Sequence, residues 1–291
     1  MDKNHNIFIT TPSSDYELID SGEMAKLERF GSVRMVRPDP QAIWSRSNKP
    51  EWQNVDAIFT RKGNNGNWKF NSSVKEEWQI ELSGVKFWVK PTSFKHTGVF
   101  PEQSVNWQWM QHVIKNSKRT DIKVLNLFGY TGGATIACLS AGASVVHVDG
   151  SKAAIGWAKD NVELNGLSDK PVKYMLDDVK KFVAREVRRE NTYDAIIMDP
   201  PSFGYGPHDE PWKIENDFRE LVELLGKVIT PNPLFIIASG YASGYSSMSY
   251  VNLLRPLFRD NKGVLEHGEL ALSSKEGHVL PAGICVRYLF V

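Results

Sequence analysis

The sequence is poor in cysteine, has no excess of charge of either sign and contains no long hydrophobic run. Its 291 residues include two cysteines, 35 basic residues against 34 acidic ones, and 41% apolar side chains. Two cysteines cannot cross-link a disulfide-rich domain, and no apolar run approaches the ~20 residues of a membrane span. A net charge near zero argues against a surface that binds polyanions throughout. With no signal-peptide pattern, we expect a soluble protein of a reducing, cytoplasmic compartment.

Two parts of the sequence differ in pattern. Short alternating apolar and polar runs, separated by Pro, Gly and Asn, extend from about residue 34 to 90, and they predict antiparallel sheet with a hairpin tip at 61–67. After Pro101, apolar runs alternate with glycine turns and helical stretches, which is typical of a parallel sheet covered by helices. We therefore predict an α/β protein with a small β-rich domain at 1–95 and a second domain at 96–291. The strands predicted after Pro101 are 123–127, 144–149, 172–175, 194–199 and 234–239, the helices 132–141, 151–165, 178–190 and 213–229, and a last β pair covers 263–272 and 283–291.

A glycine-containing loop follows the first predicted parallel strand. The loop, NLFGYTGG at residues 126–133, opens a helix, so backbone N–H groups are expected to face a ligand at the carboxyl end of the strand. Its spacing matches neither the dinucleotide nor the triphosphate glycine motif, which argues against NAD and ATP. Asp149 ends the next strand and is placed to accept hydrogen bonds from ribose hydroxyls. The pattern predicts a nucleotide-like cofactor.

A second loop, DPPSF at residues 199–203, follows the fourth predicted strand. Two prolines hold an extended backbone without N–H donors, which leaves the Asp199 carboxylate and the Pro200 carbonyl as a rigid pair of acceptors. Such acceptors hold an amine or hydroxyl during attack, and Phe203 and Tyr205 are candidates to stack on a planar base. The alternative is a proline-rich turn with core aromatics. His208 is a candidate for proton transfer, and a lid is the alternative for its segment.

Five ordered motifs together resemble the class I S-adenosylmethionine (SAM) dependent methyltransferases, over about residues 94–291. More narrowly, they are similar to the bacterial family whose members methylate large-subunit ribosomal RNA on cytosine C5 or guanine N7. The resemblance implies a Rossmann-like, mostly parallel sheet with an antiparallel last strand. The motifs are FKHTGVFPEQ at 94–103, NLFGYTGG at 126–133, VDGS at 148–151 with AKDNVELNG at 158–166, DDV at 177–179, and DPPSF at 199–203.

The resemblance also implies a role for each site residue. The segment 128–132 surrounds the methionine part of SAM, Asp149 binds the ribose, and Asp178 with the Val179 amide binds the adenine. Asp199 and Pro200 border the transferred methyl group and hold the acceptor, Phe203 stacks on it, and Phe100 and Gln103 close the pocket. The implied cofactor-binding residues are Phe100, Gln103, Asn126, Phe128, Gly129, Tyr130, Thr131, Gly132, Asp149, Gly150, Ser151, Asp178, Val179 and Asp199, and no metal is required.

Three departures from the family pattern bear on the substrate. Asn126, Phe128 and Tyr130 replace the acid and two glycines of the most familiar SAM loop. Relatives that methylate cytosine C5 carry a nucleophilic Cys at the end of the fifth strand, where this chain has Ala-Ser-Gly-Tyr at 238–241. The chain's two cysteines, Cys138 and Cys285, read instead as buried apolar residues. Where RNA-modifying relatives often have Asp-Gln-Arg, this chain has Glu-Gln-Ser at 102–104, so an RNA-contacting Arg is missing.

The first part of the chain is locally basic and rich in tryptophan. Residues 29–69 hold eight basic and three acidic side chains, interleaved with Trp44, Trp52 and Trp68. Basic charge with aromatic faces suits nucleic acid, although small β domains also use Trp to fill the core. We predict a SAM-dependent methyltransferase acting on a nitrogen of an RNA base, with ribosomal RNA favoured and no membrane or metal partner. The alternatives are methylation of a protein or small molecule, and a non-catalytic RNA-binding protein that retained the fold.

Overall fold

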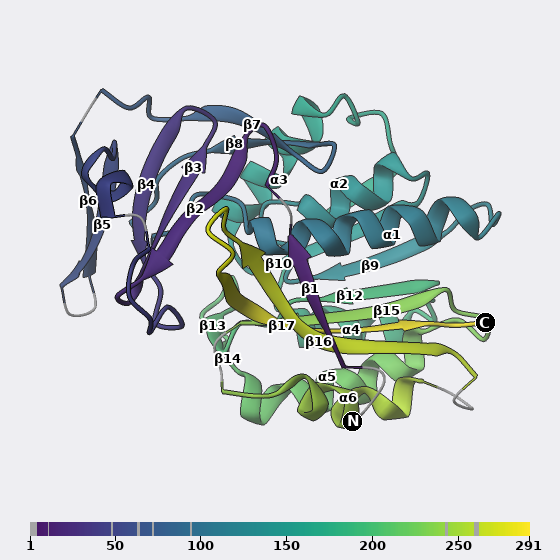
Figure 1. The fold of residues 1–291 in the computed structure, drawn as a ribbon. Helices are drawn as coiled ribbons and strands as arrows, with labels where there is room; N and C mark the ends of the chain where they lie inside the picture. The colour runs from purple at the N-terminus through teal and green to yellow at the C-terminus, as the bar shows by residue number, and fades with distance from the viewer. Residues whose placement is uncertain are drawn as a thin grey trace. The chain divides into compact units, whose positions relative to one another are not determined.

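The computed structural model describes residues 5–10, 12–47, 49–62, 65–71, 73–93, 95–241, 244–258 and 262–291 (Figure 1). The chain folds into two compact units. The larger unit holds residues 1–7, 106–269 and 283–291, and the smaller unit holds 8–105 and 270–282. The predicted domain boundary between residues 95 and 96 stays a prediction, and Phe94, the first residue of the FKHTGVFPEQ motif, lies outside the described residues.

The main sheet has eight strands in the order β1-β16-β17-β15-β12-β9-β10-β11. β9 pairs parallel with β10 and β12, β12 with β15 and β10 with β11, whereas β17 runs antiparallel to β15. This arrangement confirms the predicted Rossmann-like class with an antiparallel last strand. The strands are β1 (His5–Thr10), β9 (Lys123–Leu127), β10 (Ser144–Asp149), β11 (Val172–Leu176), β12 (Ala195–Met198), β15 (Phe235–Gly240), β16 (Val264–Ser273) and β17 (Val279–Leu289).

Helices cover both faces of this sheet, with α1, α2 and α3 on one face and α4, α5 and α6 on the other (Figure 1). All four residues of β12 are buried, as expected for a central strand of a sheet covered on both faces. The helices are α1 (Ser104–Asn116), α2 (Gly133–Ser140), α3 (Lys152–Leu164), α4 (Val179–Arg188), α5 (Ile214–Val228) and α6 (Ser247–Leu254). The sequence patterns did not predict α1 and α6.

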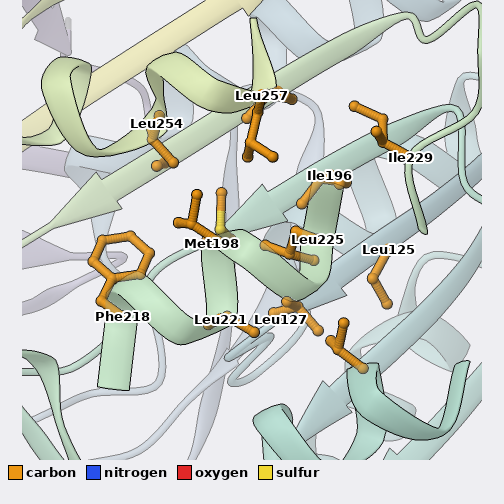
Figure 2. Close-up of a cluster of buried hydrophobic side chains, with 14 of the residues drawn as sticks. Leu125, Leu127, Ile196, Met198, Phe218, Leu221, Leu225, Ile229, Leu254 and Leu257 are labelled. Carbon is orange, nitrogen blue, oxygen red and sulfur yellow. The ribbon is translucent and has the colours of Figure 1, made fainter. Parts of the chain in front are cut away.

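One core cluster packs the second helical face against the central strands (Figure 2). Apolar side chains recur along α5 at helical spacing, so one stripe of the helix faces the sheet. Burying this stripe removes apolar surface from water and holds the carboxyl ends of the strands in place. The residues labelled in Figure 2 are Leu125, Leu127, Ile196, Met198, Phe218, Leu221, Leu225, Ile229, Leu254 and Leu257.

The smaller unit contains a five-stranded sheet in the order β2-β3-β4-β5-β6 and the separate pair β7-β8. β5 and β6 pair antiparallel, as predicted for a hairpin, whose residues Gly63 and Asn64 lie outside the described residues. The sequence patterns did not predict β2 and β3. The strands are β2 (Tyr16–Gly22), β3 (Ala25–Phe30), β4 (Val33–Pro38), β5 (Ala57–Lys62), β6 (Asn65–Phe70), β7 (Trp78–Leu82) and β8 (Val85–Val89).

The tryptophans of the smaller unit hold neighbouring segments together. The indole N–H groups of Trp44, Trp68 and Trp78 donate to backbone carbonyls, and that of Trp52 donates to the Asp20 carboxylate. Among the described basic side chains, Arg29 pairs with Glu17, Arg34 with Glu51, Arg37 with Glu28 and Arg46 with Glu23, all acids of the same unit. These contacts favour a structural role for the tryptophans and reduce the positive charge left for nucleic acid.

Candidate functional site

The site is built where four strands of the main sheet end at the same level. Leu127 at the end of β9 pairs with Val148 of β10 and with Met198 of β12, and Met198 pairs with Ala238 of β15. The loops that follow these strands therefore leave the sheet side by side. The strand order reverses at β9, and ligands of such sheets bind in the crevice at that point, beyond the carboxyl ends of the strands.

The glycine loop after β9 has a conformation that glycine favours, although two of its positions carry aromatic residues. Phe128 has φ 58°, Tyr130 has φ 49° and Gly132 has φ 91°. The Gly129 N–H donates to the Val148 carbonyl at 3.1 Å, which ties the loop to β10. A bulky residue at positive φ stores backbone strain, and such strain concentrates at functional sites. Two of the three left-handed positions of this loop thus carry an aromatic residue and not glycine.

Aromatic packing holds this strained loop against the DPPSF loop. The Phe128 ring lies with its centroid 4.9 Å from that of Trp212, which is buried. The Trp212 indole N–H donates to the Pro201 carbonyl at 2.7 Å. One tryptophan therefore supports both loops of the site, and the sequence patterns did not single it out.

A buried polar chain lies beneath the glycine loop. Asn126 Nδ2 donates to Thr135 Oγ1 at 2.9 Å, and that hydroxyl lies 2.9 Å from His147 Nδ1. The Thr135 oxygen has two lone pairs, so which atom donates in its bond with Nδ1 depends on the tautomer of the imidazole. Burial lowers the pKa of His147 to about 4, so the ring is neutral at physiological pH. The Asn126 amide serves this chain, and its predicted contact with the cofactor stays a prediction.

We expect Gly129→Ala to destabilise the protein because there is no room for a side chain. A Cβ at this position would lie 2.5 Å from Cε1 and 2.6 Å from Nδ1 of the buried His147 ring. Overpacking of this kind costs about 1–3 kcal/mol, so the melting temperature in calorimetry should fall. Gly156→Ala is the matched control, since no atom lies within 4 Å of its Cβ on α3 and Ala favours a helix by about 0.5–1 kcal/mol. Equal melting temperatures for the two variants would contradict this packing.

Asp149 lies at the end of β10 with both carboxylate oxygens directed by the backbone. Oδ2 accepts from the Tyr130 N–H and Oδ1 from the Ser151 N–H, each at 2.8 Å. Burial raises the pKa of Asp149, and the two backbone donors oppose this shift by favouring the charged form. A carboxylate oxygen has two lone pairs, so each oxygen retains capacity for a further donor. This geometry suits a pair of ribose hydroxyls.

The residues around Asp149 pack closely and are held by hydrogen bonds. Ser151 caps α3 by accepting from the Ala154 N–H, and Gly150 has no room for a Cβ, which would lie 2.8 Å from the Tyr205 carbonyl oxygen. Thr131 is buried, and its carbonyl accepts from Asn161 Nδ2 at 2.9 Å. These contacts position the loop backbone between β9 and α3.

Asp178 caps the helix that follows β11. Its Oδ1 accepts from the Lys181 N–H at 2.8 Å, and Val179 is the first residue of α4. Asp149 pairs with Leu176 in the sheet, and the Asp177 N–H donates to the Asp149 carbonyl. The structure therefore brings the predicted adenine-binding residues to the same edge of the sheet as the predicted ribose-binding residue.

The DPPSF loop leads into a short hairpin that the sequence patterns did not predict. β13 (Phe203–Tyr205) pairs antiparallel with β14 (Pro211–Lys213), and His208 lies between these strands. The Phe203 and Tyr205 side chains are 51% and 60% exposed, with ring centroids 5.0 Å apart. The alternative of a proline turn with core aromatics is therefore wrong for these two rings. Pro200, just before them, is buried.

Two of the predicted pocket residues belong to the smaller unit. Phe100 precedes the 3₁₀ helix η2 (Pro101–Gln103), and its ring lies 5.2 Å from that of His96. The closing of a cofactor pocket by Phe100 and Gln103 stays a prediction. Among the described residues, no three His, Cys, Asp or Glu side chains form a group that could hold a metal ion. In the same part of the chain, no helix has the length and apolar character needed to span a membrane.

A sheet that reverses its order at β9, with a glycine turn, an acidic residue after β10 and an Asp-Pro-Pro loop after β12, defines a Rossmann-like methyltransferase domain. The chain belongs to the SAM-dependent methyltransferases: the family model described as S-adenosylmethionine-dependent methyltransferase matches residues 52–242. The crystal structure of a SAM-dependent methyltransferase from Agrobacterium tumefaciens is similar to it, with 40% sequence identity, a TM-score of 0.93, and coverage of 98% of this chain and 93% of that chain.

Curated relatives carry a more specific name. The chain is 31% identical over 167 residues to ribosomal RNA large subunit methyltransferase K/L of Shewanella frigidimarina, which covers 57% of this chain and 22% of the relative. It is 30% identical over 199 residues to the protein of the same name from Pseudoalteromonas atlantica, covering 68% and 25%. The chain thus spans about a quarter of the length of these relatives.

Proposed function

We propose that the protein methylates a nitrogen of an RNA base, with ribosomal RNA favoured, and that SAM is the methyl donor. The observation that carries the proposal is the position of Asp199 and Pro200 at the carboxyl end of β12, followed by the exposed rings of Phe203 and Tyr205. Exposed aromatic rings beside an acceptor pair suit a base that has left its stack. The names of the curated relatives favour ribosomal RNA.

The residues present fit SAM. The Asp149 carboxylate retains acceptor capacity for the two ribose hydroxyls. The glycine turn is assigned to the methionine part of SAM, and Asp178 with the Val179 amide to the adenine. When bound, SAM supplies an electrophilic methyl group on a positively charged sulfur, and after the transfer this sulfur is part of a neutral thioether. Asp199 and the Pro200 carbonyl hold an acceptor N–H so that the nitrogen lone pair points at the methyl group. As the new N–C bond forms and the S–C bond breaks, the proton of this N–H passes to the Asp199 carboxylate, and the alignment is the main contribution of the protein to the rate.

The positions of the two cysteines support nitrogen as the acceptor. Cys138 on α2 and Cys285 on β17 are buried, and burial raises the pKa of both thiols, that of Cys285 to about 11. A buried, protonated thiol is a poor nucleophile, and methylation of cytosine C5 requires a thiolate. Ser239, near the end of β15, is buried, and its hydroxyl accepts from Asn106 Nδ2 at 3.3 Å. A nitrogen lone pair needs no covalent activation of this kind.

Nucleoside mass spectrometry of RNA from a deletion strain tests the proposal. We expect one N-methylated nucleoside to disappear from the large ribosomal RNA and to return when wild-type protein is expressed. The protein carrying Asp199→Asn is the control and should not restore it. If the RNA is unchanged and the purified enzyme labels protein or small molecules, the substrate is one of these and not RNA. An absence of SAM binding in calorimetry would favour the non-catalytic alternative.

A further inference from the structure

The hydroxyl group of Tyr250 is buried in the core and forms no hydrogen bond with any of the described residues. Tyr250 lies on α6, and its side chain is 2% exposed. Its ring belongs to the same core cluster as Phe218, which Figure 2 labels, and packs edge-on against it with centroids 5.3 Å apart. A buried hydroxyl without a partner costs free energy that phenylalanine would avoid. The hydroxyl is therefore a candidate for a role other than packing.

The hydroxyl lies at the edge of the main sheet at which the DPPSF loop begins. A Cβ on Gly240, the last residue of β15, would lie 2.3 Å from Tyr250 Oη, so the hydroxyl rests against the backbone of this glycine. Because Met198 pairs with Ala238 in parallel strands, Asp199 follows at the level of Ser239, next to Gly240. Asp199, the first residue of the DPPSF loop, thus follows the strand next to the one that ends at Gly240, against which the hydroxyl rests.

The hydroxyl keeps its proton at this position. Burial and the negative charge of Asp199 both raise the pKa of Tyr250 well above its usual range. A protonated phenol can donate one hydrogen bond, and a carboxylate is the strongest acceptor at hand.

We propose that Tyr250 is a positioning residue for Asp199: its hydroxyl donates to the Asp199 carboxylate when a methyl acceptor enters the site. The bond would hold one carboxylate oxygen, so that the other faces the acceptor nitrogen. This inference rests on the proposed function, because it assigns Asp199 to the acceptor. It also explains why Gly occupies position 240, where any side chain would displace the hydroxyl.

Tyr250→Phe removes the hydroxyl and retains the ring. We expect its melting temperature to equal or exceed that of the wild type, its SAM affinity in calorimetry to stay unchanged, and kcat for RNA methylation to fall about 10-fold or more with little change in KM. Tyr193→Phe is the matched control, because the buried Tyr193 hydroxyl donates to Glu186 Oε2 at 2.7 Å. That variant should lose thermal stability and keep kcat. An unchanged kcat for Tyr250→Phe, or a stability loss equal to that of Tyr193→Phe, would overturn the proposal.

A measurement without turnover separates this inference from the proposed function. Protein labelled with ¹³Cζ-tyrosine gives one NMR signal for Tyr250, assigned by its loss in Tyr250→Phe. The charge of Asp199 acts on this hydroxyl before any acceptor enters, so we expect the signal to move in Asp199→Asn. It should stay in place in Asp209→Asn, a change on the exposed hairpin between β13 and β14. If wild-type protein fails to methylate RNA, the proposed function fails and the NMR result still decides on Tyr250. A signal indifferent to Asp199→Asn would refute the positioning role.

Discussion

Asp199→Asn should lower kcat for methyl transfer by about 100-fold or more, while SAM still binds. The substitution keeps the size of the side chain and removes its charge. The new NH₂ group is a hydrogen-bond donor, and it would face the N–H of the nitrogen to be methylated, which is also a donor. Buried apolar side chains of β12 fix the backbone up to Met198, so the fold should tolerate the change. Single-turnover transfer from methyl-labelled SAM to RNA of the deletion strain measures the rate, and calorimetry measures SAM binding.

Asp209→Asn is the matched control for this prediction. Asp209 is exposed near the tip of the hairpin with φ 60°, a conformation that asparagine tolerates at least as well as aspartate. The control removes the same charge at small backbone cost and should transfer methyl groups at the wild-type rate. A wild-type rate for Asp199→Asn as well would show that Asp199 does not hold the acceptor.

Asp149→Asn should weaken SAM binding by about 10–100-fold, because hydrogen bonds to a charged group contribute about 1.5–3 kcal/mol. The carboxylate accepts from two backbone N–H groups, of Tyr130 and Ser151, and an amide side chain presents one oxygen and one donor to these two donors. The variant therefore loses an acceptor for the ribose and a bond that holds the glycine loop. Isothermal calorimetry with SAM measures both the affinity and any loss of sites.

The pH dependence of SAM binding provides a second check on Asp149. Burial raises the pKa of this carboxyl, so protonation begins at a higher pH than for an ordinary aspartate near 3.9. The ionised form is the acceptor, and SAM affinity should therefore fall as the pH is lowered through the raised pKa. Asp149→Asn should show no such fall, whereas Asp160→Asn, an exposed change on α3, should behave as the wild type. A flat pH profile for the wild type would contradict the role of the carboxylate.

The sequence predicted the parallel strands β9, β10, β11, β12 and β15 closely because their signal is local, whereas β1 of the same sheet was missed. β9 and β10 begin and end at the predicted residues, since each is an apolar run bounded by polar or turn residues. β3 was missed because its buried residues include Glu28, whose charge is compensated by Arg37 from β4 at 2.8 Å. The β13–β14 hairpin was missed because each of its strands has only three residues and includes Pro or Gly.

For the site, too, local sequence signals could be recognised and contacts between distant residues could not. Asp149 and Asp199 could be proposed from the sequence, because each follows an apolar strand directly and parallel strands end at one edge. Trp212, His147 and Tyr250 could not be proposed from the sequence. An aromatic or histidine side chain at helical or strand spacing is indistinguishable from core filling until the partners of its polar atoms have been located.

The amino-acid sequence by itself determined the alternation of parallel strands and helices from β9 to β15, the loops that carry the chemistry and the family to which the chain belongs. These are properties of neighbouring residues, namely the hydrophobic period and the turn residues at strand ends. Only the tertiary structure decided that Phe128 and Tyr130 adopt the left-handed conformation and that Trp212 joins the two loops. Likewise, it placed the buried hydroxyl of Tyr250 against the backbone of Gly240 at the end of β15. The physical reason is that burial, strain and hydrogen-bond satisfaction depend on residues distant in the chain that meet only when the core is packed.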